Sequence, residues 1–135
     1  MRKRIAAMAT ALVLGCVGAV FGAGPAAAAT CFALASPPLL SGGTVVGKNT
    51  AGCSGGPANI SVYVSVEWQL PHDGGWIEIA KDKVTMSVGQ KRSVTTSALC
   101  NGTTPSGYRT RGTIYLNGVH KTSSTTNRVR LPCGR

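Results

Sequence analysis

Acidic residues and histidines are scarce in this sequence. It contains four Asp and Glu and two His against fourteen Lys and Arg. All four acids lie between Glu67 and Asp82, the histidines are His72 and His120, and there is no Cys-x-x-Cys motif. Metal sites and most hydrolytic sites need several such groups at close spacing. We therefore expect no metal, no cofactor and no enzymatic activity.

Glu67 and Glu78 support the strongest enzymatic alternative. In a β-hairpin they would lie diagonally on the exposed face, roughly 7–8 Å apart, and inverting glycosidases use a carboxylate pair at such a separation. No motif places a Ser or Cys nucleophile, and the adjacent His72 and Asp73 suit a turn better than a charge-relay pair. Two exposed glutamates on a strand are therefore the preferred interpretation.

Helical periodicity is missing after residue 29, whereas apolar and polar residues often alternate. The longest alternating stretch, 60–80, reads ISVYVSVEWQLPHDGGWIEIA. Apolar side chains occupy its even positions from Ile60 to Leu70, which is the pattern of a half-buried strand. The stretch is therefore predicted to form a long β-hairpin with its even face in the core.

The register of this hairpin depends on its turn. Asp73-Gly74 suits a two-residue type I′ turn. That turn would pair inward-facing apolar residues of the two strands: Leu70 with Ile77 and Trp68 with Ile79. A register slipped by two residues would set Glu67 opposite Glu78, where like charges repel, so we prefer the Asp-Gly turn.

The first 29 residues have the layout of a secretory signal peptide. Three basic residues, an apolar run over residues 5–21, a Gly/Pro break and an alanine-rich processing site follow one another. The apolar run is short for a membrane span. Cleavage would leave a mature chain that begins at Thr30 and forms one domain over residues 30–135.

Cys16 raises the alternative of a lipid anchor. Val13-Leu14-Gly15-Cys16 is similar to a degenerate lipobox, but the apolar run continues past the cysteine, and Leu14 is a poor match to the small residue preferred there. Secretion is therefore expected, with lipid anchoring through Cys16 as the alternative. The Ala-rich leader and the composition resemble small exported proteins of high-G+C Gram-positive bacteria, which implies a bacterial source.

Four cysteines remain after the leader: Cys31, Cys53, Cys100 and Cys133. An even number in a secreted chain of about 105 residues indicates two disulfides. Strand directions would bring Cys31 and Cys53 to one end of an antiparallel pair, and Cys100 and Cys133 to a shared end of their strands. We predict these two bridges.

Further segments have the alternation or composition of strands. They are 30–41, in which Pro37-Pro38 indicates an edge strand, then 44–53, 84–88 after a turn or bulge at 81–83, 93–100, 108–116 and 128–133. About seven short strands separated by turn signals predict an all-β fold, a small antiparallel two-sheet sandwich that is broadly Ig-like, with a small barrel as the alternative. The resemblance to immunoglobulin-type domains covers strand number and length, and we do not expect their disulfide between the sheets with a Trp packed on it.

Positive charge dominates the mature chain. Loss of the leader leaves eleven basic against four acidic residues, a net charge of +7, and residues 91–135 contain eight Lys and Arg and no acid. Alternation turns one set of side chains outward on successive strands, with a histidine near the turn: Arg109, Arg111, Tyr115, His120, Arg128 and Arg130. Such a basic face attracts polyanions through screened electrostatics. Only Tyr115 offers a stacking ring among them, so specific nucleic-acid recognition is not indicated.

The hairpin tip is a second candidate binding site. In the preferred register Trp76 turns away from the core, beside a rigid turn formed by Pro71, His72 and Asp73. An exposed tryptophan in such a position could anchor a partner. The alternative is that Trp76 covers the end of the sandwich.

These features predict a small exported, non-enzymatic binding protein. It would be a monomer without membrane association, and its basic face would recognise an anionic cell-wall polymer or an acidic extracellular protein. The alternative is an inhibitor of a secreted hydrolase that acts through the loop from Pro71 to Trp76.

Overall fold

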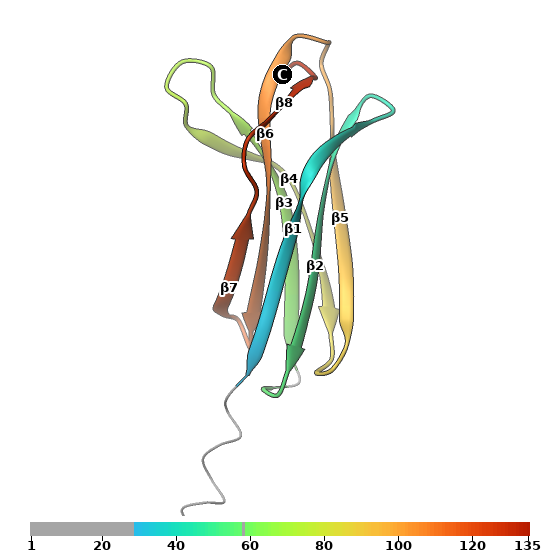
Figure 1. Cartoon of the computed structure of the whole chain (residues 1–135), viewed down its shortest axis with the longest axis vertical. Coiled ribbons are helices and arrows are strands. Elements are labelled where there is room, and N and C mark those ends of the chain that lie inside the picture. The colour runs from blue at the N-terminus through green and yellow to red at the C-terminus, as the bar shows by residue number, and fades with distance from the viewer. Residues whose placement is uncertain (1–28, 58) are drawn as a thin grey trace, which may run out of the picture.

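The computed structural model describes residues 29–57 and 59–135, which form two antiparallel sheets packed face to face (Figure 1). The strands are β1 (Thr30–Ser41), β2 (Thr44–Ser54), β3 (Ile60–Gln69), β4 (Trp76–Met86), β5 (Lys91–Leu99), β6 (Pro105–Leu116), β7 (Val119–Thr125) and β8 (Val129–Pro132). The predicted all-β sandwich is confirmed, with eight strands in place of about seven. Most of the predicted leader, including Cys16, lies outside the described residues.

The smaller sheet has the strand order β1-β2-β5. As predicted, β1 is an edge strand, and its pairing with β2 is interrupted between Ser36 and Leu39, at the two prolines. Proline has no backbone N–H to give to the ladder, so it is tolerated at such an edge. On the other side, β2 pairs with β5 from Thr44 to Gly52 without interruption.

The larger sheet has five strands in the order β4-β3-β6-β7, and β8 also pairs with β6. Strand β6 is long enough to pair with two strands along one edge, β8 along 105–108 and β7 along 111–116. The hairpin between β6 and β7 turns at Asn117 and Gly118, which both have positive φ, 51° and 83°. The Asn-Gly signal in the sequence is therefore confirmed.

The core lies between the two sheets and follows the alternation of β3. The fully buried apolar residues of that strand are those at its even positions, as predicted: Ile60, Val62, Val64 and Val66. Asn49 on β2 is also fully buried, and its side-chain nitrogen donates to the backbone carbonyl of Tyr63 at 2.9 Å. Gly112 leaves the space that this amide occupies. A polar contact therefore joins the two sheets inside a largely apolar core.

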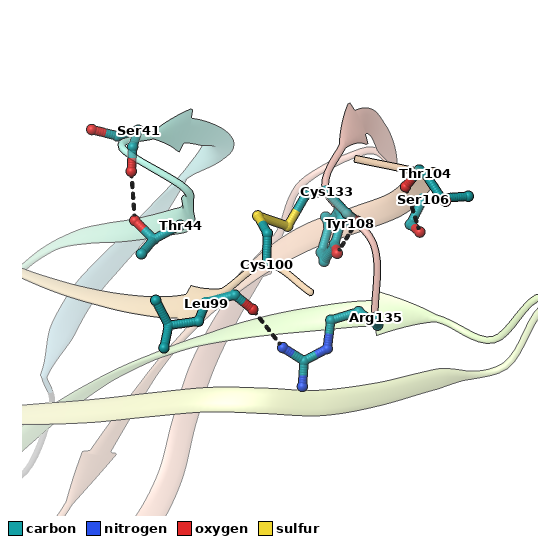
Figure 2. The surroundings of a disulfide bond; sticks show 9 residues. All are labelled: Ser41, Thr44, Leu99, Cys100, Thr104, Ser106, Tyr108, Cys133 and Arg135. Carbon is teal, nitrogen blue, oxygen red and sulfur yellow. Dashed lines mark hydrogen bonds between the residues drawn. A yellow bond between two sulfur atoms is a disulfide. The ribbon is translucent and has the colours of Figure 1, made fainter. Parts of the chain in front are cut away.

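Both predicted disulfides are present. Cys31–Cys53 joins residues directly opposite each other on β1 and β2, and Cys100–Cys133 joins the end of β5 in one sheet to the end of β8 in the other (Figure 2). Trp68 packs in the same hydrophobic cluster as Cys100 and Cys133. The expectation that no disulfide would link the two sheets is therefore wrong. With separations of 22 and 33 residues, each bridge contributes about 3.5 kcal/mol in the chain-entropy model.

The register of the β3–β4 hairpin differs from the prediction. Trp68 pairs with Ile77 and Glu67 with Glu78, which is the slipped register, and the loop spans residues 70–75 in place of a two-residue turn. The two glutamates therefore lie directly opposite each other and not diagonally. The physical reason lies on a third strand, because β6 brings two arginines to Glu67 and relieves the repulsion.

A bulge in β4 also lies earlier than predicted. Pairing passes from Glu67–Glu78 to Val66–Ala80 and leaves Ile79 without a partner, whereas the predicted interruption at 81–83 is regular strand. One extra residue reverses which side chains face the core, so Val84 and Met86 point inward as expected. Two residues predicted in the core, Ile77 and Val88, are 42% and 40% exposed.

Candidate functional site

The face of the larger sheet that points away from the smaller sheet carries most of the residues singled out in the sequence; we call it the outer face. Its side chains come from all five strands of that sheet. Among them are Tyr63 and Glu67 on β3, Trp76, Glu78, Lys81 and Lys83 on β4, Arg109, Arg111 and Tyr115 on β6, His120 on β7, and Arg128 and Arg130 at β8. The outer face of the smaller sheet has only Lys48 and Lys91 as charged residues among the paired positions of β2 and β5.

The middle of the outer face is an ionic cluster around Glu67. Nε of Arg109 lies 2.6 Å from one carboxylate oxygen of Glu67, and Nε of Arg111 lies 3.4 Å from the other. The Glu67 side chain is only 11% exposed. A carboxylate removed from water needs such partners. Arg109 and Arg111 do share the outer face, as predicted, but much of their charge is neutralised there.

Trp76 lies beside this ionic cluster. It pairs with Gln69 in the sheet, and the guanidinium carbon of Arg109 lies 4.2 Å from its ring centroid. The ring is thus turned away from the core, as predicted, but it is half-buried beneath an arginine. This cation–π contact contributes about 0.5–1 kcal/mol. Trp76 therefore belongs to the surface of the sheet and does not project from the tip.

Aromatic rings and lysines cover the part of the outer face near the β6–β7 turn. Tyr63 and Tyr115 pack edge to face with centroids 5.4 Å apart, and His120 packs against Tyr115 at 5.8 Å. The amino groups of Lys81 and Lys83 lie 4.9 and 5.8 Å from the Tyr63 centroid. Two shallow hollows of about 210 and 130 Å³ adjoin the tyrosine pair.

Sequence reasoning missed Tyr63, Lys81 and Lys83 as members of this group. The alternation of β3 already turned Tyr63 outward. The two lysines needed the correct hairpin register, in which Lys83 pairs with Tyr63 and Lys81 with Ser65. The bulge at Ile79 determines that register, and no turn signal in the sequence marks it.

A cleft of about 390 Å³ lies at the other end of the outer face, between β8 and the β3–β4 loop; we call it the β8 cleft. Gln69 and Pro71 line one side, Ser106 and Gly107 of β6 the floor, and Arg128 and Arg130 the other side. In Figure 1 the β3–β4 loop projects from the same end of the sandwich as β8 and the C-terminus.

The six residues predicted to form one basic patch therefore fall into three groups. Arg128 and Arg130 adjoin Gly107, Arg109 and Arg111 lie in the middle, and Tyr115 and His120 lie at the far end. Gly107 and Tyr115 are about 27 Å apart along β6, at about 3.4 Å per residue. The groups share one face, but they form a stripe along β6 and not a single patch.

The β3–β4 loop is held in shape by hydrogen bonds of its own. The backbone nitrogen of Leu70 donates to the carbonyl of Gly75 at 2.7 Å, and the nitrogen of Gly75 donates to the carboxylate of Asp73 at 2.8 Å. Pro71, His72 and Asp73 are exposed at the tip. An ordered loop over residues 70–75 therefore replaces the predicted two-residue turn, which is wrong.

Tyr108 supports the β8 end from inside the core. Its hydroxyl donates to the backbone carbonyl of Cys133 at 2.6 Å, next to the Cys100–Cys133 disulfide (Figure 2). Burial raises the pKa of Tyr108 above its ordinary value of 10.0, against smaller lowering contributions from Arg135 and Ser106. The neutral hydroxyl is therefore the form that the fold stabilises.

Over residues 29–57 and 59–135, no three His, Cys, Asp or Glu side chains are grouped so that they could hold a metal ion. In the same part of the chain there is no helix long and apolar enough to cross a membrane.

The chain has little detectable similarity to known proteins. No family model matches it, and no curated protein does. Among solved structures, DesR, a β-glucosidase from Streptomyces venezuelae, is similar with a TM-score of 0.41 and 13% identity, over 75% of this chain and 15% of that protein. The ApaA protein from Bordetella pertussis is similar with a TM-score of 0.39 and 12% identity, over 82% of this chain and 99% of that one.

Proposed function

We propose that this chain is a small exported, non-enzymatic binding protein whose outer face binds an anionic cell-wall polymer or an acidic extracellular protein. The observation that supports this most is the presence of cations from β4, β6 and β8 on one face of one sheet, with the rings of Tyr63 and Tyr115 beside the lysines of β4. Two disulfides fit an oxidising compartment, and the leader-like first 29 residues fit export.

The lysines near Tyr63 and the arginines of the β8 cleft contribute most to this binding. Lys81, Lys83, Arg128 and Arg130 have no ion pair with a carboxylate in the described part of the chain, whereas Arg109 and Arg111 are paired with Glu67. A cation that already contacts a carboxylate gains less from a second anion. Lys81 and Lys83, which sequence reasoning missed, therefore belong to the binding surface, because both lie on the outer face.

Binding to heparin resin and to isolated cell walls over a range of salt concentrations tests the proposal. Exposed charges are screened within about 8 Å at physiological ionic strength, so retention must fall steeply as salt rises. The variant Lys81→Gln/Lys83→Gln should elute at lower salt than the wild type. Lys48→Gln/Lys91→Gln, which removes the same charge from the smaller sheet, should elute close to the wild type. Equal losses in the two variants would mean that net charge alone drives retention.

The inhibitor alternative rests on the ordered β3–β4 loop. Its internal hydrogen bonds fix the backbone around the exposed Pro71, His72 and Asp73, and a rigid loop loses little entropy on docking into a protein cleft. Tight, salt-insensitive inhibition of a hydrolase from the producer's culture medium, lost on Pro71→Ala/His72→Ala, would favour this function over polyanion binding.

A further inference from the structure

Arg128 and Arg130 approach Gly107 from the same side of the sheet. Arg130 pairs with Gly107 in the β6–β8 register, and the Arg128 side chain lies over it: a Cβ added at Gly107 would be 2.7 Å from Nε of Arg128 and 2.9 Å from Oε1 of Gln69. The absence of a side chain at Gly107 therefore lets a guanidinium and an amide meet on the floor of the β8 cleft.

No acidic side chain neutralises these two arginines. The lining of the cleft contains no Asp or Glu. Of the four acids in the chain, Glu67 is paired with Arg109 and Arg111, and Asp73 accepts from the backbone of Gly75. The other two, Glu78 and Asp82, lie on β4 and do not line the cleft. The β8 cleft therefore has two positive charges and no internal counterion.

The number of guanidinium groups indicates which anion fits. A carboxylate is planar, and its two oxygens are satisfied by one bidentate arginine. A phosphate ester is tetrahedral and has up to two negative charges, so two guanidinium groups can bind different oxygens. Arg128 directly precedes β8, and Arg130 lies on it. Residues two apart in extended backbone have Cα atoms about 7 Å apart, so both long side chains can reach a single phosphate.

We infer that the β8 cleft is a phosphate-binding site, with Arg128 and Arg130 as its charged groups and Gln69 and Ser106 as polar neighbours. The cleft volume of about 390 Å³ exceeds one phosphate and falls in the range of small-ligand pockets. The ligand class is thus a phosphate ester with a polar substituent, either free or as one unit of an anionic polymer. The inference rests on the proposed function only for the second of these sources.

An NMR titration with inorganic phosphate tests the site directly. The Nε–H signals of Arg128 and Arg130 and the amide of Gly107 should shift with a saturable dependence on phosphate. Acetate at the same ionic strength should bind at least tenfold more weakly. Equal saturation by acetate and phosphate would overturn the assignment to phosphate, and linear, unsaturable shifts would overturn the site.

Two variants separate a site from net charge. Arg128→Gln/Arg130→Gln should abolish the saturable shifts. Lys48→Gln/Lys91→Gln removes the same charge from the smaller sheet and should change the affinity for phosphate by less than twofold. Equal weakening in the two variants would overturn the inference. Gly107→Ala adds one methyl group without changing the charge. It pushes against the flexible ends of Arg128 and Gln69, and it should weaken phosphate binding at least threefold in a folded protein.

The same samples distinguish failure of this site from failure of the proposed function. Saturable phosphate binding without retention on heparin or cell walls would support the phosphate site and refute polymer binding. If the wild type shows no phosphate saturation and retention survives Arg128→Gln/Arg130→Gln, the phosphate site is refuted. The outer face would then remain the polyanion-binding surface. Phosphate competition against retained protein, effective in the wild type and ineffective in Gly107→Ala, would support the polymer as the source of the phosphate.

Discussion

The middle of the outer face and its β8 end each have two arginines, but the two pairs lie in different environments. Arg109 and Arg111 surround a carboxylate that is nearly removed from water, whereas Arg128 and Arg130 border an open cleft without an acid. The first pair compensates a buried charge, and the second has charge available for a ligand. A count of basic residues in the sequence cannot make this distinction, because it depends on where Glu67 lies.

The arginines around Glu67 also explain why the slipped hairpin register is tolerated. Glu67 opposite Glu78 is unfavourable for an isolated β3–β4 hairpin. In the sheet, β6 lies on the other side of β3 and sets Arg109 directly opposite Glu67. Pairing with the third strand therefore outweighs a repulsion that exists only between the first two.

The largest expected effect on stability separates the two arginine pairs. Arg109→Gln leaves the buried Glu67 carboxylate with Arg111, at 3.4 Å, as its remaining partner, and we expect it to lower the free energy of unfolding by about 2 kcal/mol. Arg128→Gln removes the same charge from an exposed position and should cost less than about 0.5 kcal/mol. Urea denaturation of both variants measures the difference. Similar losses would show that the environments of the two arginines are energetically alike.

Glu67→Gln should change stability and binding in opposite directions. Removing the carboxylate leaves Arg109 and Arg111 without their ion pairs, but both are partly exposed and can be hydrated, so the loss should be about 1.5 kcal/mol. The same change frees two cations on the outer face. The variant should elute from heparin resin at higher salt than the wild type, and Glu78→Gln serves as the control of equal charge. A larger gain from Glu78→Gln would contradict the neutralising role of Glu67.

The sequence predicted the features that depend on local pattern or on simple geometry. Alternation located β3 and its buried even face, Pro37-Pro38 indicated the edge position of β1, and strand direction gave both disulfide pairings. In each case one strand, or one pair of strands, contains all the information that is needed.

The features that the sequence did not predict depend on three strands at once. The contacts of Glu67 with β6 relieve the repulsion that opposes the hairpin register, and the bulge at Ile79 then sets the positions of Lys81 and Lys83. The β8 cleft needs the folded positions of the β3–β4 loop, β6 and β8, which are separated along the chain. No local pattern contains these relations, so the candidate site was recognised as a set of residues but not as an arrangement.

Substitution of Tyr108 tests whether its hydrogen bond to Cys133 stabilises the β8 end of the sandwich. Tyr108→Phe removes the hydroxyl and leaves the carbonyl of Cys133 without this donor, so we expect a loss of about 1 kcal/mol at neutral pH. Because the pKa of Tyr108 is raised in the fold, the native state holds the phenolic proton more tightly than the unfolded chain. Its contribution is fully present below pH of about 10 and is lost as pH rises through the folded pKa.

Urea denaturation between pH 8 and pH 11 measures this dependence. The wild type should lose stability more steeply than Tyr108→Phe at the alkaline end, so the two curves should converge. The Gly107 amide and its neighbours on β8 should shift in the NMR spectrum of the variant, while the signals of Tyr63 and Tyr115 should not. Parallel pH curves would show that Tyr108 does not titrate with folding.

The smallest expected effect is the coupling between Arg109 and Trp76. The guanidinium lies 4.2 Å from the ring centroid, and a cation–π pair at a partly exposed site contributes about 0.5–1 kcal/mol. A double-mutant cycle of Arg109→Gln with Trp76→Ala should return a coupling of this size. The control cycle of Lys83→Gln with Trp76→Ala should be additive, because Lys83 lies over Tyr63 and not over Trp76. A coupling near zero in the first cycle would place Trp76 outside the ionic cluster, where its ring would be available to a partner and the inhibitor function would gain support.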